Sequence, residues 1–180
     1  MPASNPNSWR SLLFIPAVAE RFVAKAHTRG ADVIILDLED SIPPSEKDTA
    51  RAALPAAAKA IAAHGQEICV RINRPLELAV PDIAAAIMPE VSSLMLPKVM
   101  GPEHIKLLSE VVAARETALG MPIGHTRFIG VVETPDALPA LHAIALADPR
   151  MARRFACASI ARWNWLCPTL RRRSCRKCPP

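Results

Sequence analysis

Polar side chains that could do chemistry follow short apolar runs at four places in the sequence. The run VIIL at residues 33–36 leads into three carboxylates, Asp37, Glu39 and Asp40. Carboxylates this close raise one another's pKa unless a cation or a hydrogen-bond donor offsets their repulsion. The later apolar runs end in such cations or donors, namely Arg71, Asn73 and Lys98, and in one further acid, Glu133. We expect these seven residues to form one mixed-charge site.

These residue types suit chemistry on an anionic substrate through a hard cation. Magnesium favours oxygen ligands and takes one or two carboxylates, which leaves positions for water and substrate. The guanidinium of Arg71 is a planar fork that matches a carboxylate or a phosphate. Such a set could bind a 2-oxo or 2-hydroxy carboxylate and stabilise an enolate, with the metal acting as a Lewis acid.

A structural alternative stands beside each of these assignments. Arg71 could pair with Glu39 or Asp40 as a salt bridge at the end of a strand, and Lys98 could be a solvated loop lysine. Asp40 could cap the turn before Pro43. The histidines offer no nucleophile–base arrangement, and we interpret them as surface residues: His27, His64, His104, His125 and His142.

Five apolar segments, each followed by a helical pattern, must position the site. The predicted strands cover 11–15, 32–38, 68–73, 93–97 and 127–133, and the predicted helices cover 18–29, 45–65, 81–88, 101–120 and 135–148. Ser45 with Asp48 has the spacing of a capping box at the start of the second helix. Strands that alternate with helices indicate an α/β fold with a parallel sheet, either a barrel or a doubly wound sheet.

The barrel is favoured because no glycine-rich nucleotide-binding loop follows any strand. We therefore predict an incomplete (β/α)8 TIM-type barrel of about five βα units. In such folds the ligand site lies at the carboxyl ends of the strands, which is where the polar residues fall.

Composition divides the chain near Arg150. All 17 acidic residues lie at or before Asp148, whereas the segment after Arg150 is basic and contains four of the five cysteines. We expect a partial barrel domain over 9–150 and an irregular, basic, Cys-rich tail over 151–180. No apolar run approaches the ~20 residues of a membrane helix, and the first ten residues lack the pattern of a secretory signal. These features predict a cytoplasmic protein without a membrane partner.

Five motifs carry a family resemblance. In order, RSLLFIP, ADVIILDLEDSIPPSEKDTAR, VRIN, SLMLPKV and VVET resemble the HpcH/HpaI aldolase and citrate lyase beta-chain-like family, over residues 9–150. The resemblance implies a magnesium-dependent carbon–carbon lyase of the aldolase or Claisen type. Its substrate would be a 3-hydroxyacyl thioester such as citryl-CoA or malyl-CoA, carried by coenzyme A or an acyl carrier protein. The products would be a 2-oxo acid and an acyl thioester, and the intact family would form homo-oligomers.

The resemblance also implies a role for individual residues. Glu133 matches the first magnesium ligand, Arg71 matches the arginine that holds the substrate carboxylate, and Glu39 matches the acid that supports the metal site. We expect Arg71 and Glu39 to be catalytic, with Glu133 as the metal ligand. The expected substrate-binding residues are Arg71, Asn73, Lys98 and Glu133.

The sequence departs from the family in two ways. Ala17 follows Pro16 where glycine is usual, and no aspartate stands where the second magnesium ligand is expected, because residues 151–180 contain no acid. For this tail, a zinc module and a nucleic-acid-binding segment are less favoured than a shifted reading frame near residue 151. We expect no nucleic-acid partner and a chain that is inactive as written. The alternative is a degenerate barrel that binds a small organic acid or thioester without catalysis.

Overall fold

The computed structural model describes residues 9–156, and within them the strands form one parallel sheet. The strands pair in the order of the chain: β1 (Leu12–Pro16), β2 (Val33–Asp37), β3 (Glu67–Arg71), β4 (Ser93–Leu96), β5 (Arg127–Val131) and β6 (Met151–Ala156). Sequential order is that of a (β/α)8 barrel, whereas a doubly wound sheet reverses its order partway. The predicted parallel α/β fold of the barrel type is confirmed.

The sixth strand corrects the predicted element count. We expected five strands and irregular structure from residue 151, but Met151–Ala156 pairs in parallel with β5. The register between Phe128 and Gly130 contains an irregularity. A strand edge with unpaired N–H and C=O groups accepts a neighbouring strand readily, so pairing with β5 extends the sheet past residue 150. The remainder of the predicted tail, from residue 157, lies outside the described residues, as do Cys157, Cys167, Cys175 and Cys178.

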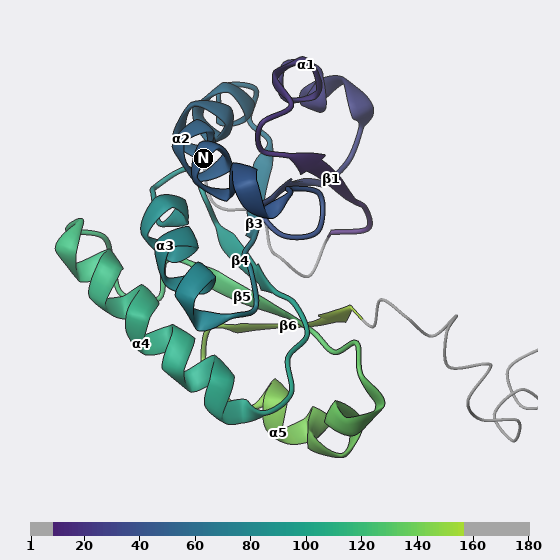
Figure 1. The fold of residues 1–180 in the computed structure, drawn as a ribbon, viewed down its shortest axis with the longest axis vertical. Coiled ribbons are helices and arrows are strands. Elements are labelled where there is room, and N and C mark those ends of the chain that lie inside the picture. Colours follow the sequence, from purple (N-terminus) through teal and green to yellow (C-terminus); the bar gives the residue numbers. More distant parts are fainter. Residues whose placement is uncertain (1–8, 157–180) are drawn as a thin grey trace, which may run out of the picture.

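The helices lie along one side of the sheet, each next to its neighbour in the sequence (Figure 1). They are α1 (Glu20–Val23), α2 (Lys47–Ala62), α3 (Leu76–Ala86), α4 (Pro102–Ala118) and α5 (Leu141–Ala145), with 3-10 turns at Ala26–Arg29, Pro44–Glu46 and Pro135–Ala140. The predicted capping box is wrong. Because Pro44–Glu46 forms a turn, α2 begins after Glu46 and no side chain caps it.

The core has two parts because side chains of a strand alternate between its faces. On β2, Ile34 and Leu36 pack in the larger cluster against the helices. Val33 and Ile35 belong to a smaller cluster on the other face, with Trp9, Cys69, Met95, Ile129 and Val131. All five residues of β2 are buried, so its polar end is placed by a rigid strand.

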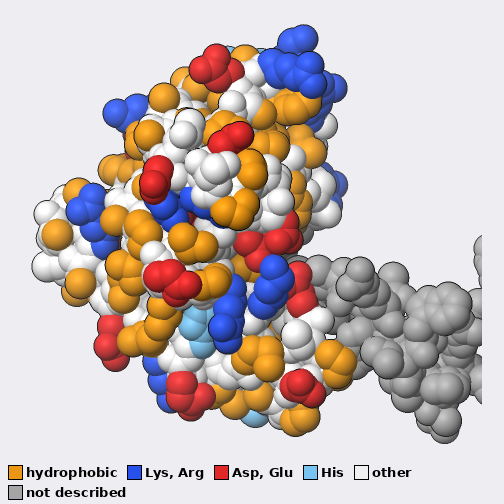
Figure 2. All heavy atoms as spheres, viewed as in Figure 1, with side chains coloured by type: hydrophobic (Ala, Val, Ile, Leu, Met, Phe, Trp, Pro, Cys, Tyr) orange, Lys and Arg blue, Asp and Glu red, His pale blue; other side chains and the backbone are white. Residues whose placement is uncertain are grey.

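None of the helices in residues 9–156 combines the length and apolar character that crossing a membrane requires. Basic and acidic side chains are interspersed on the face shown in Figure 2.

Candidate functional site

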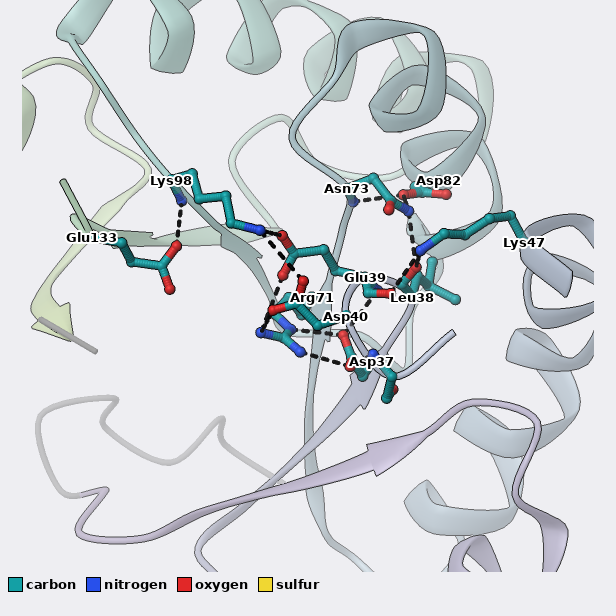
Figure 3. A network of polar contacts seen from close by, with 11 residues as sticks. Asp37, Leu38, Glu39, Asp40, Lys47, Arg71, Asn73, Asp82, Lys98 and Glu133 are labelled. Carbon is teal, nitrogen blue, oxygen red and sulfur yellow. Dashed lines mark hydrogen bonds and ion pairs between the residues drawn. The ribbon is translucent and has the colours of Figure 1, made fainter. Parts of the chain in front are cut away.

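The charged residues predicted to meet do come together at the carboxyl ends of the strands (Figure 3). Asp37 ends β2 and Arg71 ends β3, and the two are register partners across the sheet. Lys98 follows β4 by two residues, and Glu133 follows β5 by two residues. Parallel strands thus deliver four groups from separate parts of the sequence to one edge.

Arg71 pairs chiefly with Asp37, a partner in addition to the expected Glu39 and Asp40. Arg71 Nε and Nη2 each donate to Asp37 at 2.7 Å, whereas Nη1 lies 3.1 Å from Glu39 and 3.4 Å from Asp40. Burial alone would raise the pKa of Asp37, but hydrogen bonds from Arg71, Ser41 and Glu39 outweigh it and hold the pKa below its ordinary value. The pair therefore stays charged at neutral pH.

Glu39 and Lys98 form the second ion pair of the site. Lys98 Nζ donates to Glu39 Oε1 at 2.6 Å and lies 3.4 Å from Asp40, so it is paired rather than solvated alone. Burial raises the pKa of Glu39 against the opposing effects of Lys98 and Arg71. The bond to Glu39 raises the pKa of Lys98, which favours the ammonium form.

Lys98 also contacts the fourth acid through its backbone. Its N–H donates to Glu133 Oε2 at 3.1 Å, and its φ of 52° is the only positive value at a non-glycine residue among the described residues. A side chain in this left-handed region is strained, and such strain is concentrated at functional sites. One residue thus bridges Glu133 and Glu39.

A buried network holds the loop that carries the acids. Asp82 on α3 is fully buried and accepts from Arg51 Nε and from the backbone and side-chain nitrogens of Asn73, each at 2.7 Å. Asn73 Nδ2 also donates to the carbonyl oxygen of Leu38, and Lys47 Nζ donates to the carbonyls of Leu38 and Glu39. The amide hydrogens of Asn73 are therefore used inside the protein.

A small cavity joins two of the predicted site residues. It has a volume of about 170 Å³ and is lined by Arg71 and Glu133 together with Leu12, Phe14, Ile35, Met95, Pro97 and Val131. Phe14 also lies against the guanidinium, whose carbon is 4.8 Å from the ring centroid. A second hollow of about 470 Å³ is lined by Glu39 and Lys98 and reaches Lys47 and Arg74. The first cavity has charged groups at its polar end and apolar walls elsewhere.

The donor set at this edge suits a hard cation in part. Within residues 9–156 no group of three or more His, Cys, Asp or Glu side chains is placed to hold a metal ion. Glu39 Oε2 is nevertheless buried and, among the described residues, accepts no hydrogen bond, although Arg71 Nη1 lies 3.1 Å away. A buried oxygen that accepts no hydrogen bond from the protein is usually satisfied by an ordered water or an ion. Glu39 therefore offers one oxygen of the kind that magnesium takes beside water and substrate.

Sequence reasoning missed three residues that organise the site. Asp37 was placed in the acidic cluster without a role of its own, and Lys47 and Asp82 were not considered. For Asp37 a signal exists, because it is the last residue of the strand and lies in register with Arg71. Lys47 and Asp82 lie on helices, and nothing in their local pattern indicates which loop they contact.

Comparison with known proteins gives a family match over most of the chain. Residues 10–159 match the family model described as HpcH/HpaI aldolase/citrate lyase. The citrate lyase subunit beta of Leuconostoc mesenteroides subsp. cremoris is 30% identical over 149 residues, which are 81% of this chain and 48% of that protein. A (3S)-malyl-CoA thioesterase of Cereibacter sphaeroides (strain ATCC 17025 / ATH 2.4.3) is 33% identical over 143 residues, covering 72% of this chain and 50% of that protein.

Solved structures agree with this match. The citrate lyase beta subunit of M. tuberculosis, complexed with oxaloacetate and magnesium, is 29% identical with a TM-score of 0.56, covering 77% of this chain and 53% of that chain. The chain spans about half the length of the curated relatives it matches.

Proposed function

Because the chain belongs to the HpcH/HpaI aldolase/citrate lyase family, we propose that it serves a magnesium-dependent carbon–carbon lyase reaction on a 3-hydroxyacyl thioester. Citryl-CoA and malyl-CoA are the proposed substrates, and the products are a 2-oxo acid and an acyl thioester. The observation that carries the proposal is that Arg71 and Glu133 line one cavity of about 170 Å³. Its charged end suits a carboxylate and its apolar walls exclude water from the reacting carbons.

Each residue of the cavity edge has a proposed task. Arg71 binds the substrate carboxylate through Nη1, the arm whose protein contacts are the longest, and Lys98 adds a second positive charge. Glu133 holds the magnesium ion, with Glu39 supporting it. When bound, the ion polarises the substrate oxygens as a Lewis acid and offsets the negative charge that develops on the enolate. Asn73 is reassigned from substrate binding to holding the acidic loop, because its amide donates to Leu38 and Asp82.

The charge of the site supports the need for a divalent cation. Figure 3 labels the carboxylates Asp37, Glu39, Asp40, Asp82 and Glu133 beside the cations Lys47, Arg71 and Lys98, and Asp82 also pairs with Arg51. A dicarboxylate entering this site would add negative charge to a surplus of the same sign. Like charges in a partly buried site repel strongly, so anion binding should improve when a dication is present.

Titration calorimetry of the 180-residue protein with oxaloacetate, with and without magnesium, tests the proposal. We expect magnesium to strengthen binding. Glu133→Gln should remove that dependence, and Arg71→Lys should weaken binding about tenfold or more by losing the planar fork. Glu110→Gln is the matched control, because Glu110 is exposed on α4 away from the carboxyl ends of the strands. Binding that is the same with and without magnesium and unchanged in both site variants would refute the proposal.

A non-catalytic binding protein is the second candidate. It is favoured by the lack of a three-ligand metal cluster within the described residues. The two candidates differ in turnover, which is measured by the release of acetyl-CoA from citryl-CoA or of acetyl-CoA and glyoxylate from malyl-CoA. Oxaloacetate binding without cleavage of either thioester would support the binding protein.

A further inference from the structure

The carboxylate of Asp37 is the most completely bonded group at the site. It is 1% exposed. Oδ1 accepts from Arg71 Nε and from the N–H of Glu39, and Oδ2 accepts from Arg71 Nη2 and from the N–H of Ser41, at 2.7, 2.9, 2.7 and 3.1 Å. A carboxylate offers about four acceptor positions, and all four are used within the protein. Asp37 is therefore not available to touch a substrate or a metal ion.

Two of these four bonds determine how Arg71 is presented. Asp37 occupies the edge of the guanidinium formed by Nε and Nη2, and the ring of Phe14 lies against its face. The remaining edge carries Nη1, which lies 3.1 Å from Glu39 and 3.4 Å from the exposed Asp40. Arg71 and Glu133 line the same cavity, so the orientation of this second edge sets where a bound carboxylate lies relative to Glu133.

Asp37 also shapes the loop that carries Glu39. By accepting from the N–H groups of Glu39 and Ser41, it closes a turn of the kind that aspartate side chains make with the backbone two residues ahead. The loop is held on its other side by Lys47, which donates to the carbonyls of Leu38 and Glu39. One side chain thus couples the direction of Arg71 to the position of Glu39.

We propose that Asp37 is a positioning residue for the reaction, which acts through Arg71 by reserving one edge of its guanidinium and directing the other at the substrate carboxylate. This inference rests on the proposed function and adds to it the residue that sets substrate orientation. It predicts that Asp37 governs carboxylate affinity without contacting the ligand.

A matched control is built into the fold. Glu116 is also buried, and it also accepts from two arginine nitrogens, of Arg150, and from two backbone N–H groups, of Gly124 and Thr126. It lies near the amino-terminal end of β5, far along the strands from the site. Glu116→Gln therefore removes the same kind of charge and the same kind of bond without altering Arg71.

The test compares Asp37→Asn with Glu116→Gln in the full 180-residue chain at a temperature where circular dichroism shows both folded. Oxaloacetate is titrated in the presence of magnesium. We expect Asp37→Asn to raise Kd about tenfold to hundredfold, the range for losing hydrogen bonds to a charged group, and Glu116→Gln to leave Kd unchanged. Asp37→Glu, which restores the carboxylate, should recover part of the affinity and serves as the second variant where Asp37→Asn fails to fold.

A measurement without ligand gives an independent readout. The Nε–H of Arg71 should give a slowly exchanging nitrogen–proton NMR signal that Asp37→Asn weakens and Glu116→Gln preserves. An unchanged Kd in Asp37→Asn, or an Arg71 Nε–H that exchanges as fast as that of the exposed Arg10, would overturn this inference and leave the proposed function standing. If the unaltered chain binds no oxaloacetate at any magnesium concentration, the proposed function is wrong and the inference falls with it.

Discussion

The buried pair of Arg150 and Glu116 leads to a stability prediction that is independent of catalysis. Glu116 is 0% exposed and Arg150 is 4% exposed. Arg150 Nη1 and Nη2 donate to the two carboxylate oxygens at 2.8 and 2.6 Å, and Arg150 also donates to Ser109 Oγ and to the carbonyl of Thr126. The pair ties the end of α4 and the start of β5 to the residue that precedes β6.

Replacing Arg150 with methionine should be strongly destabilising. The change leaves the carboxylate of Glu116 buried, with the N–H groups of Gly124 and Thr126 as its remaining partners among the described residues. Removing one member of a buried pair costs about 3–5 kcal/mol, a large share of the ~5–15 kcal/mol that stabilises a typical domain. The matched surface change is Arg10→Met. Arg10 lies 3.6 Å from Asp32 with its side chain 88% exposed. Its replacement should therefore lower the free energy of unfolding by less than about 1 kcal/mol.

Urea unfolding followed by circular dichroism measures both free energies. The double variant Glu116→Leu with Arg150→Met should recover most of the loss, because an apolar pair can replace a buried ion pair at little cost. If Arg150→Met destabilises no more than Arg10→Met, the pair does not hold β6 in the way that its contacts indicate.

The same pair predicts how stability depends on pH. Burial would raise the pKa of Glu116, but Arg150 and the N–H groups of Thr126 and Gly124 hold it below its ordinary value. A carboxyl group whose pKa is lower in the folded state stabilises the fold above its unfolded pKa, and this contribution is lost as pH falls through the folded pKa. Below about pH 4.3, the ordinary value for glutamate, the unaltered protein should therefore lose stability more steeply than Glu116→Gln. If the unfolding free energies of the unaltered protein and of Glu116→Gln differ by the same amount at pH 7 and at pH 3, this expectation is contradicted.

Three further outcomes are expected at other residues. Lys98→Gly should be more stable than Lys98→Ala by roughly 1 kcal/mol in urea unfolding, because the φ of 52° strains any side chain; equal stabilities would show no strain. Asp40→Asn should tighten oxaloacetate binding about two- to fivefold in calorimetry, because Asp40 lies 3.4 Å from both Arg71 and Lys98 and competes for them; weaker binding would mean that Asp40 assists the ligand. Cys69 should resist thiol reagents until the protein unfolds, because burial raises its pKa to about 12, and rapid labelling of a variant that keeps only this cysteine would contradict that.

The strands were predictable because their signals are local. A run such as VIIL at residues 33–36 can be buried on both faces only within a layered sheet, and polar residues at the ends of parallel strands must share an edge. Helix boundaries were less predictable. Pro81 suggested the start of a helix, yet α3 begins at Leu76 and includes Pro81 in its second turn. Packing of Ala79 and Ile83 in the core outweighs the hydrogen bond lost at the proline.

The sixth strand was not predictable from local pattern. MARRFA at residues 151–156 contains two adjacent arginines and no apolar run. Its strand conformation comes from pairing with the edge of β5, a partner that exists only once the rest of the sheet has formed. The basic composition after Arg150 suggested a boundary there, but the Arg150 side chain is buried against Glu116. Net charge along a sequence does not reveal which charges are paired.

The two arginine–carboxylate pairs differ in how fully the nitrogens of each arginine are bonded within the protein. In each pair the arginine follows the acid by 34 residues, and both carboxylates are buried with two backbone N–H partners. Arg150 uses Nε, Nη1 and Nη2 in bonds of 3.1 Å or less within the protein. Arg71 uses Nε and Nη2 in the same way, but among the described residues its Nη1 has a 3.4 Å bond to Asp40 and the ion pair with Glu39 alone. Arg71 also lines a cavity. Both pairs have a buried carboxylate and the same sequence spacing, so they differ in the one arginine nitrogen that the fold leaves weakly bonded. Three-dimensional contacts, rather than residue type, decide which nitrogen that is.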